Sequence, residues 1–420
     1  MKAIHVIGPN TLDGDVDIQG SKNVALPILA ATVMIPGITI IHNCPQIVDI
    51  YQMISILEYV GCKTRWEEHT LYVDASSILS AKLPKACVKA MRSSVVLMGP
   101  LLARCGEVDL YYPGGCVIGA RPIDFHLSAL QQLQVEFEVG EDTIYGKTAA
   151  LVGHEIHLPF PSVGATQNAV LAAVCANGCS VISGGAVEPE VTELVSFLKQ
   201  AGADIVLNRK KEYVVRGVKE LHGTEFCVVS DRIVAGTYLM AGVATRGKVA
   251  LHDVPVCQMA SVLKILEKLG ARLTVQEQEV YLNASDAKEP LMHIETSVYP
   301  GFPTDLQQPM TTLLTLCNGT SSIEETIYEN RFMNIEDTVK MGAKIKVQGN
   351  SAIVQGPTNL HAARVKATDL RAGASLVIAG LIADGVTEIG NTYHIDRGYS
   401  NIEQKLNNLG AKVWRETVTE

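Results

Sequence analysis

A short element in which a helix ends and a strand begins recurs at near-constant spacing along the 420-residue chain. It reads Gly-Ala-Lys or a close variant, and its key positions are 61, 134, 202, 270, 342 and 410. Glycine after an apolar run is typical of a helix C-cap, and the alternating residues that follow predict a strand. Gln134 stands in place of glycine in the second copy, a change that we expect to alter only that turn. Six copies of about seventy residues predict stacked or rotationally arranged supersecondary units.

A second glycine marker runs in phase with the first, at positions 37, 106, 178, 247, 319 and 385. Several helical runs of the repeat, such as 26–34 and 372–383, are apolar nearly all round, which is typical of buried helices. The strands often alternate, as in 344–347, which favours a sheet with one face in water. We therefore predict an α/β fold with buried helices and solvent-facing sheets, the reverse of a doubly wound sheet.

Composition excludes several classes of function. Hydrophobic residues make up 47% of the chain, enough for two or three cores, while the net charge of −9 argues against general nucleic-acid binding. The apolar stretch 24–41 is interrupted by Pro27, Pro36 and Gly37, so we expect no membrane span. The ten cysteines form no Cys-x-x-Cys pair, and we expect Cys175 and Cys179 to be core thiols rather than metal ligands. With no export signal at the amino terminus, this pattern favours the cytoplasm.

One decapeptide at 113–122 combines three glycines with a thiol and a cation. Glycines before Cys116 let the backbone approach a ligand closely, and Arg121 would favour the thiolate. A cysteine in such surroundings suits nucleophilic or acid–base chemistry. The alternative is a Pro-Gly-Gly turn that contains an ordinary half-buried thiol.

Polar residues also stand in the loop before the first helix of each repeat. Some of them suit helix capping, because Ser, Thr and Asp satisfy the free amides at a helix start. We expect caps at Thr166, Asp231, Thr368 and Asp305.

Capping does not account for the cations in these loops. Lys22, Arg92 and Arg371 stand where a positive charge opposes the helix dipole, unless an anion lies between the cation and the helix amides. Arg232 has the simpler alternative of an ion pair. Arg121 and Arg397 occupy further glycine-containing loops. These cations predict a small, doubly charged substrate, and the chain lacks a P-loop or Gly-x-Gly-x-x-Gly nucleotide motif.

Together these motifs resemble those of the UDP-N-acetylglucosamine 1-carboxyvinyltransferase family, in order and over essentially the whole chain. The segments that carry the resemblance are 20–27, 113–122, 302–305, 329–333, 367–371 and 396–399. The resemblance implies an inside-out α/β barrel with three repeats in each of two domains. One domain would be 22–229, the other 1–21 plus 230–420, with the active site in the cleft between them.

The implied activity is enolpyruvyl transfer from phosphoenolpyruvate to the 3′-hydroxyl of UDP-N-acetylglucosamine, the first committed step of peptidoglycan synthesis. The resemblance implies a tetrahedral intermediate, release of phosphate, two small-molecule substrates, and no cofactor, metal, nucleic acid or membrane partner. The implied catalytic residues are Cys116, Asp305, Lys22 and Arg397.

The resemblance also assigns roles. Cys116 would protonate the phosphoenolpyruvate methylene, form a covalent adduct, 2-(S-cysteinyl)pyruvic acid O-phosphothioketal, and be alkylated by fosfomycin. Asp305 would accept the proton of the sugar hydroxyl. Lys22, Arg121 and Arg397 would bind phosphate and carboxylate. The remaining implied contacts are Asn23, Arg92, Pro122, Ile123, Asp124, Phe125, Ser162, Val163, Gly164, Ile327, Tyr328, Arg331, Asp369, Leu370 and Arg371.

Three alternatives remain open at this point. The related transferase that acts on shikimate 3-phosphate shares the implied fold but does not use a Pro-Gly-Gly-Cys loop. A non-catalytic repeat scaffold predicts varied loop chemistry instead of cations around one thiol and one carboxylate. A thiol hydrolase needs a histidine to activate the cysteine, and the candidate His126 has no evident acid to orient it.

Overall fold

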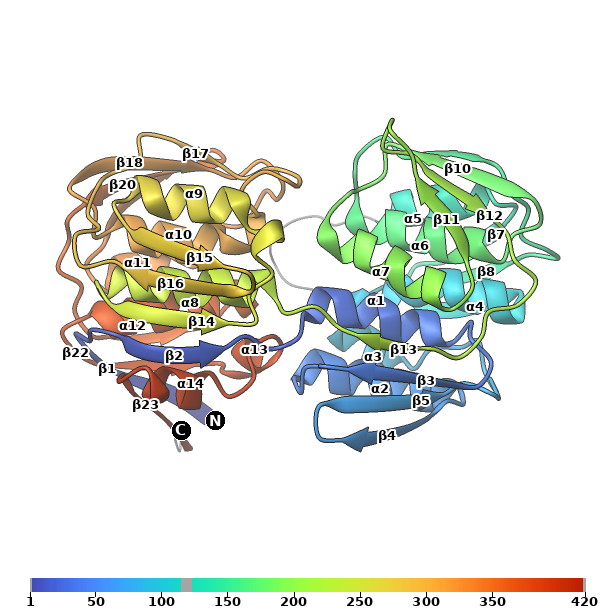
Figure 1. Cartoon of the computed structure of the whole chain (residues 1–420), viewed down its shortest axis with the longest axis horizontal. Coiled ribbons are helices and arrows are strands. Elements are labelled where there is room, and N and C mark those ends of the chain that lie inside the picture. The colour runs from blue at the N-terminus through green and yellow to red at the C-terminus, as the bar shows by residue number, and fades with distance from the viewer. Residues whose placement is uncertain (1, 115–122, 418–420) are drawn as a thin grey trace. The chain divides into compact units, whose positions relative to one another are not determined.

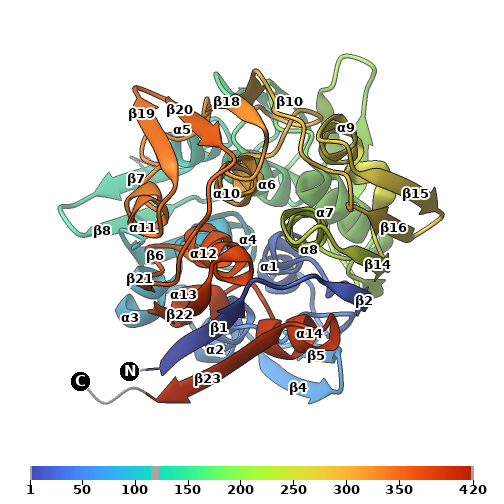
Figure 2. The same cartoon turned by 90° about the vertical axis from the view of Figure 1, so that its left-hand side faces the viewer.

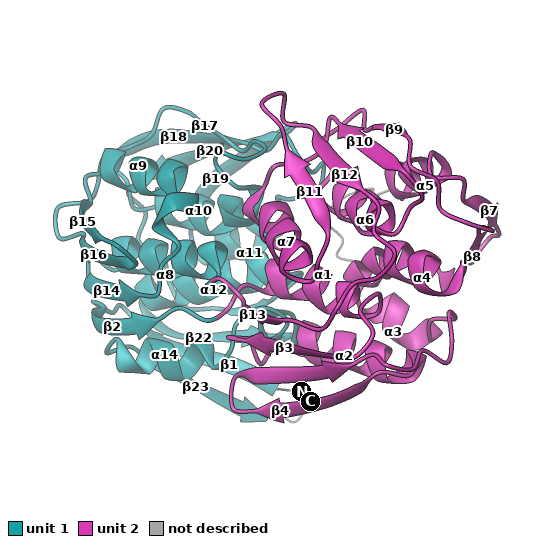
Figure 3. Ribbon diagram, turned by 45° about the vertical axis from the view of Figure 1, so that its right-hand side comes forward, with its two compact units in different colours: residues 1–19, 116–120, 230–420 teal, residues 20–115, 121–229 magenta. Residues whose placement is uncertain are grey.

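The computed structural model describes residues 2–114 and 123–417. Two compact units make up the chain, the first from the described residues of 1–19 and 230–420, the second from those of 20–115 and 121–229 (Figure 3). Each unit has its own hydrophobic core, built mainly from Val, Ile, Leu and Ala. The predicted positions Cys116, Arg121 and Pro122 lie outside the described residues.

Three long helices are buried in unit 1. They are α8 (Arg232–Ala244), α10 (Gln307–Leu314) and α12 (Leu370–Ile382). Nearly every residue of each is buried. The all-round apolar pattern predicts this burial for α12, whereas α10 also buries the polar residues Gln307, Gln308, Thr311 and Thr312. Figure 2 shows these helices in the centre of unit 1, with its sheets around them. The other helices are α9 (Ala260–Lys268), α11 (Ile335–Lys340), α13 (Tyr393–Asp396), α14 (Ile402–Asn408) and the 3-10 turns η2 (Val256–Gln258) and η3 (Thr304–Leu306).

Three four-stranded sheets belong to unit 1 (Figure 1). In order across each sheet, they are β21 (Arg364–Lys366), β22 (Gly385–Gly390), β1 (Lys2–Gly8) and β23 (Lys412–Thr417); β2 (Asp13–Asp17), β14 (Lys248–His252), β16 (Glu279–Asn283) and β15 (Arg272–Gln276); and β17 (Ile294–Glu295), β18 (Gly319–Glu324), β20 (Ser351–Gly356) and β19 (Lys344–Gln348).

Unit 2 contains α1 (Lys22–Thr32), α2 (Val48–Val60), α3 (Lys85–Ala90), α4 (Met98–Cys105), α5 (Asp124–Gln131), α6 (Val163–Val174), α7 (Pro189–Gln200) and the 3-10 helix η1 (Arg92–Leu97). Its sheets are β13 (Glu225–Cys227), β3 (Ile38–His42), β5 (Thr70–Asp74) and β4 (Lys63–Glu67); β9 (Glu155–His157), β10 (Cys179–Ser183), β12 (Tyr213–Arg216) and β11 (Asp204–Leu207); and the three strands β6 (Glu107–Tyr111), β8 (Thr143–Lys147) and β7 (Glu136–Val139).

One pattern of strand pairing recurs among the described sheets. In each four-stranded sheet, the first strand pairs in parallel with the second, and the next two pairings are antiparallel. The three-stranded sheet has the same antiparallel pairs, and Asp109 on β6 forms an isolated parallel bridge with Lys82. Helices α6, α10 and α12 each connect such a parallel pair, as crossovers require. The α/β class predicted from the sequence is confirmed.

The two series of glycine markers mark left-handed turns. In the first series Gly61, Gly202, Gly270, Gly342 and Gly410 all have φ between 87° and 115°. Gln134, the exception in that series, takes the same conformation with φ 68°. In the second series the fourth copy differs, because Arg246 (φ 52°) adopts the left-handed conformation one residue before Gly247. The backbone geometry is therefore kept where glycine is absent, at a steric cost to the side chain.

Gln134→Gly should stabilise unit 2, because glycine adopts a positive φ without the Cβ clash that Gln134 suffers. We expect the free energy of unfolding to rise by about 0.5–1 kcal/mol, measured by thermal or urea denaturation. Gln131→Gly is the matched control, because Gln131 is an exposed residue in the last turn of α5 and should lose about 1 kcal/mol as glycine. Equal destabilisation by both changes would contradict the strain at Gln134.

One of the four cap predictions was correct. Asp231 caps α8, accepting from the amides of Ile233 and Val234 at 2.8 and 3.1 Å. Thr166 and Thr368 were wrong: Ser162, four residues before Thr166, caps α6, and Asp369 caps α12. Asp305 caps no helix and binds arginines instead.

Two further expectations concern cysteines and membrane spans. Cys179 is exposed on β10 and is therefore not a core thiol, while Cys175 is partly buried. The error came from reading 175–179 as one helical run, whereas α6 ends at Val174 and a strand begins at Cys179. Among the described residues, no helix has the length and apolar character needed to cross a membrane.

Candidate active site

The described candidate residues divide between the two units. Unit 1 carries Asp305, Ile327, Tyr328, Arg331, Asp369, Leu370, Arg371 and Arg397. Unit 2 carries Lys22, Asn23, Arg92, Ile123, Asp124, Phe125, Ser162, Val163 and Gly164.

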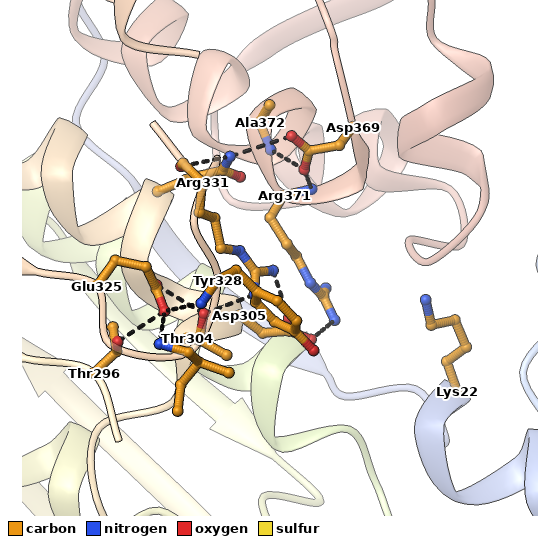
Figure 4. Close-up of polar contacts among 12 residues, drawn as sticks. Lys22, Thr296, Thr304, Asp305, Glu325, Tyr328, Arg331, Asp369, Arg371 and Ala372 are labelled. Atoms are coloured by element: carbon orange, nitrogen blue, oxygen red, sulfur yellow. Dashed lines mark hydrogen bonds and ion pairs between the residues drawn. The ribbon is translucent and has the colours of Figure 1, made fainter. Parts of the chain in front are cut away.

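Asp305 lies between two arginines in unit 1 (Figure 4). The 3-10 turn η3 presents its carboxylate, to which Arg331 Nη2 donates at 2.6 Å and Arg371 Nη2 at 2.9 Å, one to each oxygen. The two guanidinium side chains are only 3% and 4% exposed, and that of Asp305 is 27% exposed. The sequence motifs placed these three residues on separate loops, and the fold brings them into one ion-pair cluster.

The two arginines of this cluster are held in their protonated form. Burial is the largest effect on the pKa of Arg371 and lowers it, but the neighbouring groups, led by Asp305 and including Tyr399 and Asp231, together outweigh burial and raise the pKa. Burial likewise lowers the pKa of Arg331, and Asp305, Tyr328 and Glu325 together leave it raised. Glu325 thus adds a second, buried carboxylate near Arg331.

Aromatic rings support both arginines. The Arg331 guanidinium lies 5.2 Å from the ring centre of Tyr328, and Arg371 lies 5.7 Å from that of Tyr399. Arg371 Nη1 also donates to the Tyr399 hydroxyl at 3.2 Å, and that hydroxyl lies 2.9 Å from Thr237 Oγ1. Since Thr237 donates its own proton to the carbonyl of Ile233, the Tyr399 hydroxyl donates to Thr237. These contacts fix where the two cations lie.

The position of Asp369 shows that one expectation about Arg371 was wrong. Its Oδ1 accepts from the amides of Arg371 and Ala372 at 2.9 and 3.0 Å, so the first amides of α12 are capped by a side chain. An anion between Arg371 and these amides was predicted; in the structure Asp369 binds the amides and Asp305 binds the guanidinium. Asp369 Oδ2 accepts from Gln308 Nε2 at 3.2 Å, which connects α12 to α10.

Arg397 follows the short helix α13. The turn after it is held by Gln19, whose Nε2 donates to the carbonyl of Gly398 at 3.1 Å and whose Oε1 accepts from the amide of Ser400 at 2.9 Å. Before it, Asp396 forms an ion pair with Arg415 of β23. The backbone on both sides of Arg397 is therefore held in place by contacts of its neighbours.

The imidazole of His394 should report on the charge of Arg397. Burial lowers the pKa of His394 below its usual 6.5, Arg397 lowers it further, and Asp369 opposes them. Since the unfolded chain binds the proton more readily, this histidine contributes stability above pH 6.5 that is lost as the pH falls below it. In an NMR titration, Arg397→Gln should raise the His394 pKa. An unchanged or lower pKa in the variant would contradict the proximity of the two charges.

Lys22 has an acidic partner that was not foreseen. It is the first residue of α1, and its Nζ lies 3.3 Å from Asp49 Oδ2 on α2. Asp49 is 1% exposed and Lys22 9%. A buried carboxylate thus offsets a cation that the helix dipole disfavours. Asp49 stands among apolar residues in 47–50, where no sequence motif marked it.

The other candidates of unit 2 lie at the starts of helices. Ser162 accepts from the amide of Ala165 at the start of α6, and Val163 and Gly164 form its first turn. A Cβ on Gly164 would lie 2.9 Å from the ring of His126, so α5 and α6 approach closely here. Arg92 begins η1, Asp124 and Phe125 begin α5 after the buried Ile123, and Asn23 follows Lys22 on α1.

His126, the candidate base of a thiol hydrolase, is positioned by an amide. Its Nδ1 lies 2.8 Å from Asn168 Nδ2, and the Asn168 oxygen accepts from the amide of Gly99 at 2.8 Å, which fixes the orientation of the side chain. Nδ1 is therefore an acceptor, and among the described residues an amide, not a carboxylate, occupies the orienting position at this nitrogen. Within the described ranges, no group of three or more His, Cys, Asp or Glu side chains is arranged to hold a metal ion.

Sequence reasoning missed several residues around Asp305. Glu325 is a buried carboxylate directly after β18, Gln308 connects Asp369 to α10, and Tyr399 binds Arg371. Gln308 stands three residues after the motif 302–305 and Tyr399 is the last residue of the motif 396–399, so their position was a usable signal. Glu325 follows another glutamate in an unremarkable strand, where nothing in the pattern distinguished it.

The fold and this cluster can now be compared with known proteins. The family model described as EPSP synthase (3-phosphoshikimate 1-carboxyvinyltransferase) matches residues 6–406. The enolpyruvyl transferase NikO from Streptomyces tendae superposes with a TM-score of 0.90 at 25% identity, over 100% of this chain and 99% of that one. An EPSP synthase from Acinetobacter baumannii gives a TM-score of 0.78 at 17% identity, covering 99% and 100% of the two chains, and shares the fold. Fold and family model thus define the EPSP synthase class.

Relatives with curated names identify a narrower family within this class. UDP-N-acetylglucosamine 1-carboxyvinyltransferase 2 of Carboxydothermus hydrogenoformans is 44% identical over 99% of both chains. The protein of the same name from Bacillus subtilis is 41% identical over 100% of this chain and 98% of its own. The chain belongs to the family of UDP-N-acetylglucosamine 1-carboxyvinyltransferases.

Proposed function

We propose that this enzyme transfers the enolpyruvyl group of phosphoenolpyruvate to the 3′-hydroxyl of UDP-N-acetylglucosamine and releases phosphate. This is the first committed step of peptidoglycan synthesis, on which cell-wall formation, cell shape and division depend. The observation that carries the proposal is the 44% identity, over nearly the full length, to a relative with that name. The related reaction on shikimate 3-phosphate is less supported, because the EPSP synthase structure is only 17% identical.

The chemistry requires one proton delivered to carbon and one removed from oxygen. We assign the first task to Cys116, which protonates the methylene carbon of phosphoenolpyruvate so that C2 becomes electrophilic. Asp305 accepts the proton of the attacking sugar hydroxyl. Collapse of the tetrahedral intermediate expels phosphate, and loss of a proton from the methyl group restores the double bond.

The ion pairs around Asp305 bear on its role as a base. A carboxylate that accepts from two guanidinium groups is stabilised in its ionised form and is a weak base. An anionic substrate offers Arg331 or Arg371 a second acceptor, which weakens the hold of that arginine on Asp305 and makes its oxygen more basic. Lys22, Arg121 and Arg397 are proposed to bind the phosphate and carboxylate and to stabilise the charge of the intermediate.

The nucleotide sugar is proposed to contact Asn23, Arg92, Pro122, Ile123, Asp124, Phe125, Ser162, Val163, Gly164, Ile327, Tyr328 and Leu370. Cys116 is proposed to form the phosphothioketal adduct and to react with fosfomycin. Both assignments rest on the family resemblance.

The finer architecture is also a proposal. We infer an inside-out barrel of six repeats in two domains, 22–229 and 1–21 plus 230–420, with active-site residues drawn from both domains. The recurring strand order and the buried helices of the described residues support this arrangement. No disulfide joins any two of the nine described cysteines, which supports a reducing, cytoplasmic location.

Product analysis in D2O tests the proposed reaction. The enzyme, phosphoenolpyruvate and UDP-N-acetylglucosamine should give an enolpyruvyl ether at the sugar 3′-oxygen, identified by NMR. Because the methylene is transiently a methyl group, deuterium should enter the vinyl position of the product. A product without vinyl deuterium would exclude addition followed by elimination, and no ether product would refute the transferase.

A further inference from the structure

Glu325 is a buried carboxylate with four hydrogen-bond donors, directly after β18 in unit 1. It is 2% exposed. Its Oε1 accepts from Thr296 Oγ1 at 3.0 Å and from the amides of Ile327 and Tyr328 at 2.8 and 3.2 Å. Its Oε2 accepts from Thr304 Oγ1 at 2.8 Å, as Figure 4 shows.

The neighbouring donors fix the direction of these bonds. Thr304 Oγ1 accepts from Arg331 Nη1 at 2.8 Å, so its own proton is directed to Glu325. Thr296 Oγ1 accepts from the amide of Thr326 at 3.0 Å and likewise donates to Glu325. All four partners of Glu325 are therefore donors, and its two carboxyl oxygens supply an acceptor for each of them.

The two oxygens of Glu325 connect two parts of the candidate site. Oε1 holds the backbone at Ile327 and Tyr328, the segment proposed to line the sugar pocket. Oε2 holds Thr304, the residue before Asp305, and through it Arg331, whose other nitrogen binds Asp305. A single side chain thus ties the sugar-binding segment to the proposed base.

We propose that Glu325 is a positioning residue for the transfer, setting the distance between the sugar hydroxyl and Asp305. This role rests on the proposed function. Displacement of a base by about 1 Å costs up to a hundredfold in rate, so a residue that touches no reacting atom can control turnover. Its effect is expected in kcat through Thr304 and in the KM of the nucleotide sugar through Ile327 and Tyr328.

Glu325→Gln separates the two effects without changing the shape of the side chain. An amide has one acceptor oxygen, which should stay with the three donors at Oε1, so its NH2 group faces Thr304. We expect kcat to fall about tenfold, while the KM of UDP-N-acetylglucosamine changes less than about threefold. Glu325→Ala should lose both connections and raise that KM about tenfold as well. Glu324→Gln is the matched control, because Glu324 is the adjacent residue, at the end of β18, and contacts His293 and Asn350 instead; both constants should stay unchanged.

Thr304→Val tests the hydrogen bond between Glu325 and Thr304 from its other side. It keeps the proposal testable if a Glu325 variant fails to fold. It should lower kcat at least as much as Glu325→Gln, and the double variant should be no more than about twofold worse than Thr304→Val alone, because both act through one contact. If the losses in kcat of the two single variants multiply in the double variant, or if Glu325→Gln leaves kcat unchanged, the positioning role is overturned even though the wild-type enzyme still catalyses the transfer. A wild-type enzyme that transfers nothing would instead overturn the proposed function.

Discussion

Asp305→Asn should lower kcat by about three orders of magnitude, the size of effect expected when a general base is removed. Asparagine keeps the shape of the side chain but cannot accept the sugar proton. UDP-N-acetylglucosamine should still bind, because all its proposed contacts other than Asp305 are kept. Steady-state phosphate release and calorimetric binding of the nucleotide sugar together measure the two effects. A kcat within about tenfold of wild type would contradict the role of Asp305 as the base.

The same substitution should destabilise unit 1. It leaves Arg331 and Arg371, which are 3% and 4% exposed, without an ionised partner on Asp305. Because Asp305 itself is 27% exposed and water reaches it, we expect a loss of about 2–4 kcal/mol in the free energy of unfolding. Asp286→Asn is the control: Asp286 pairs with Arg272 at 2.7 Å on the surface, so stability should change by less than about 1 kcal/mol and kcat should not change.

Cys116→Ser should lose about two to four orders of magnitude in kcat while the nucleotide sugar still binds. A hydroxyl is a much weaker acid than a thiol, so it delivers a proton to the methylene carbon poorly. Cys116→Asp should retain part of the activity, because a carboxylic acid can also donate a proton, and it should resist alkylation by fosfomycin. Rapid-quench kinetics and mass spectrometry of the labelled protein measure turnover and the adduct.

The control for this cysteine is Cys179→Ser. Cys179 is exposed on β10, far in sequence from every proposed catalytic residue, and its replacement should leave turnover and fosfomycin sensitivity unchanged. Unchanged turnover in Cys116→Ser, or alkylation of both thiols at equal rates, would contradict the assignment of Cys116.

The repeat could be predicted because it depends on local backbone geometry. A helix that must turn sharply into a strand needs a positive φ, which glycine favours, so Gly61 and its counterparts were visible in the sequence. Gln134 and Arg246 could not be predicted in this way, because they adopt the same positive φ without being glycine. Where the surrounding fold imposes a positive φ on another residue, the residue type does not reveal it.

The candidate site was predicted as a set of chemical groups but not as a network. Asp305, Arg331 and Arg371 were named because their motifs resemble a family, and the ion pairs among them appeared only when η3, the segment after β18 and α12 came together. Asp49 and Glu325 were missed because a buried acid is recognisable through its side-chain partners, and two of these, Lys22 and Thr304, are 27 and 21 residues distant in sequence. Capping was also misassigned at Thr368, where the adjacent Asp369 is the stronger acceptor.

The choice of acceptor tests the central claim most directly. Phosphate release from phosphoenolpyruvate should be measured with UDP-N-acetylglucosamine and, in parallel, with shikimate 3-phosphate, using wild-type enzyme with Asp305→Asn as the blank. We predict release with the nucleotide sugar that depends on Asp305, and none above the blank with shikimate 3-phosphate. Release with shikimate 3-phosphate and none with the nucleotide sugar would contradict the account.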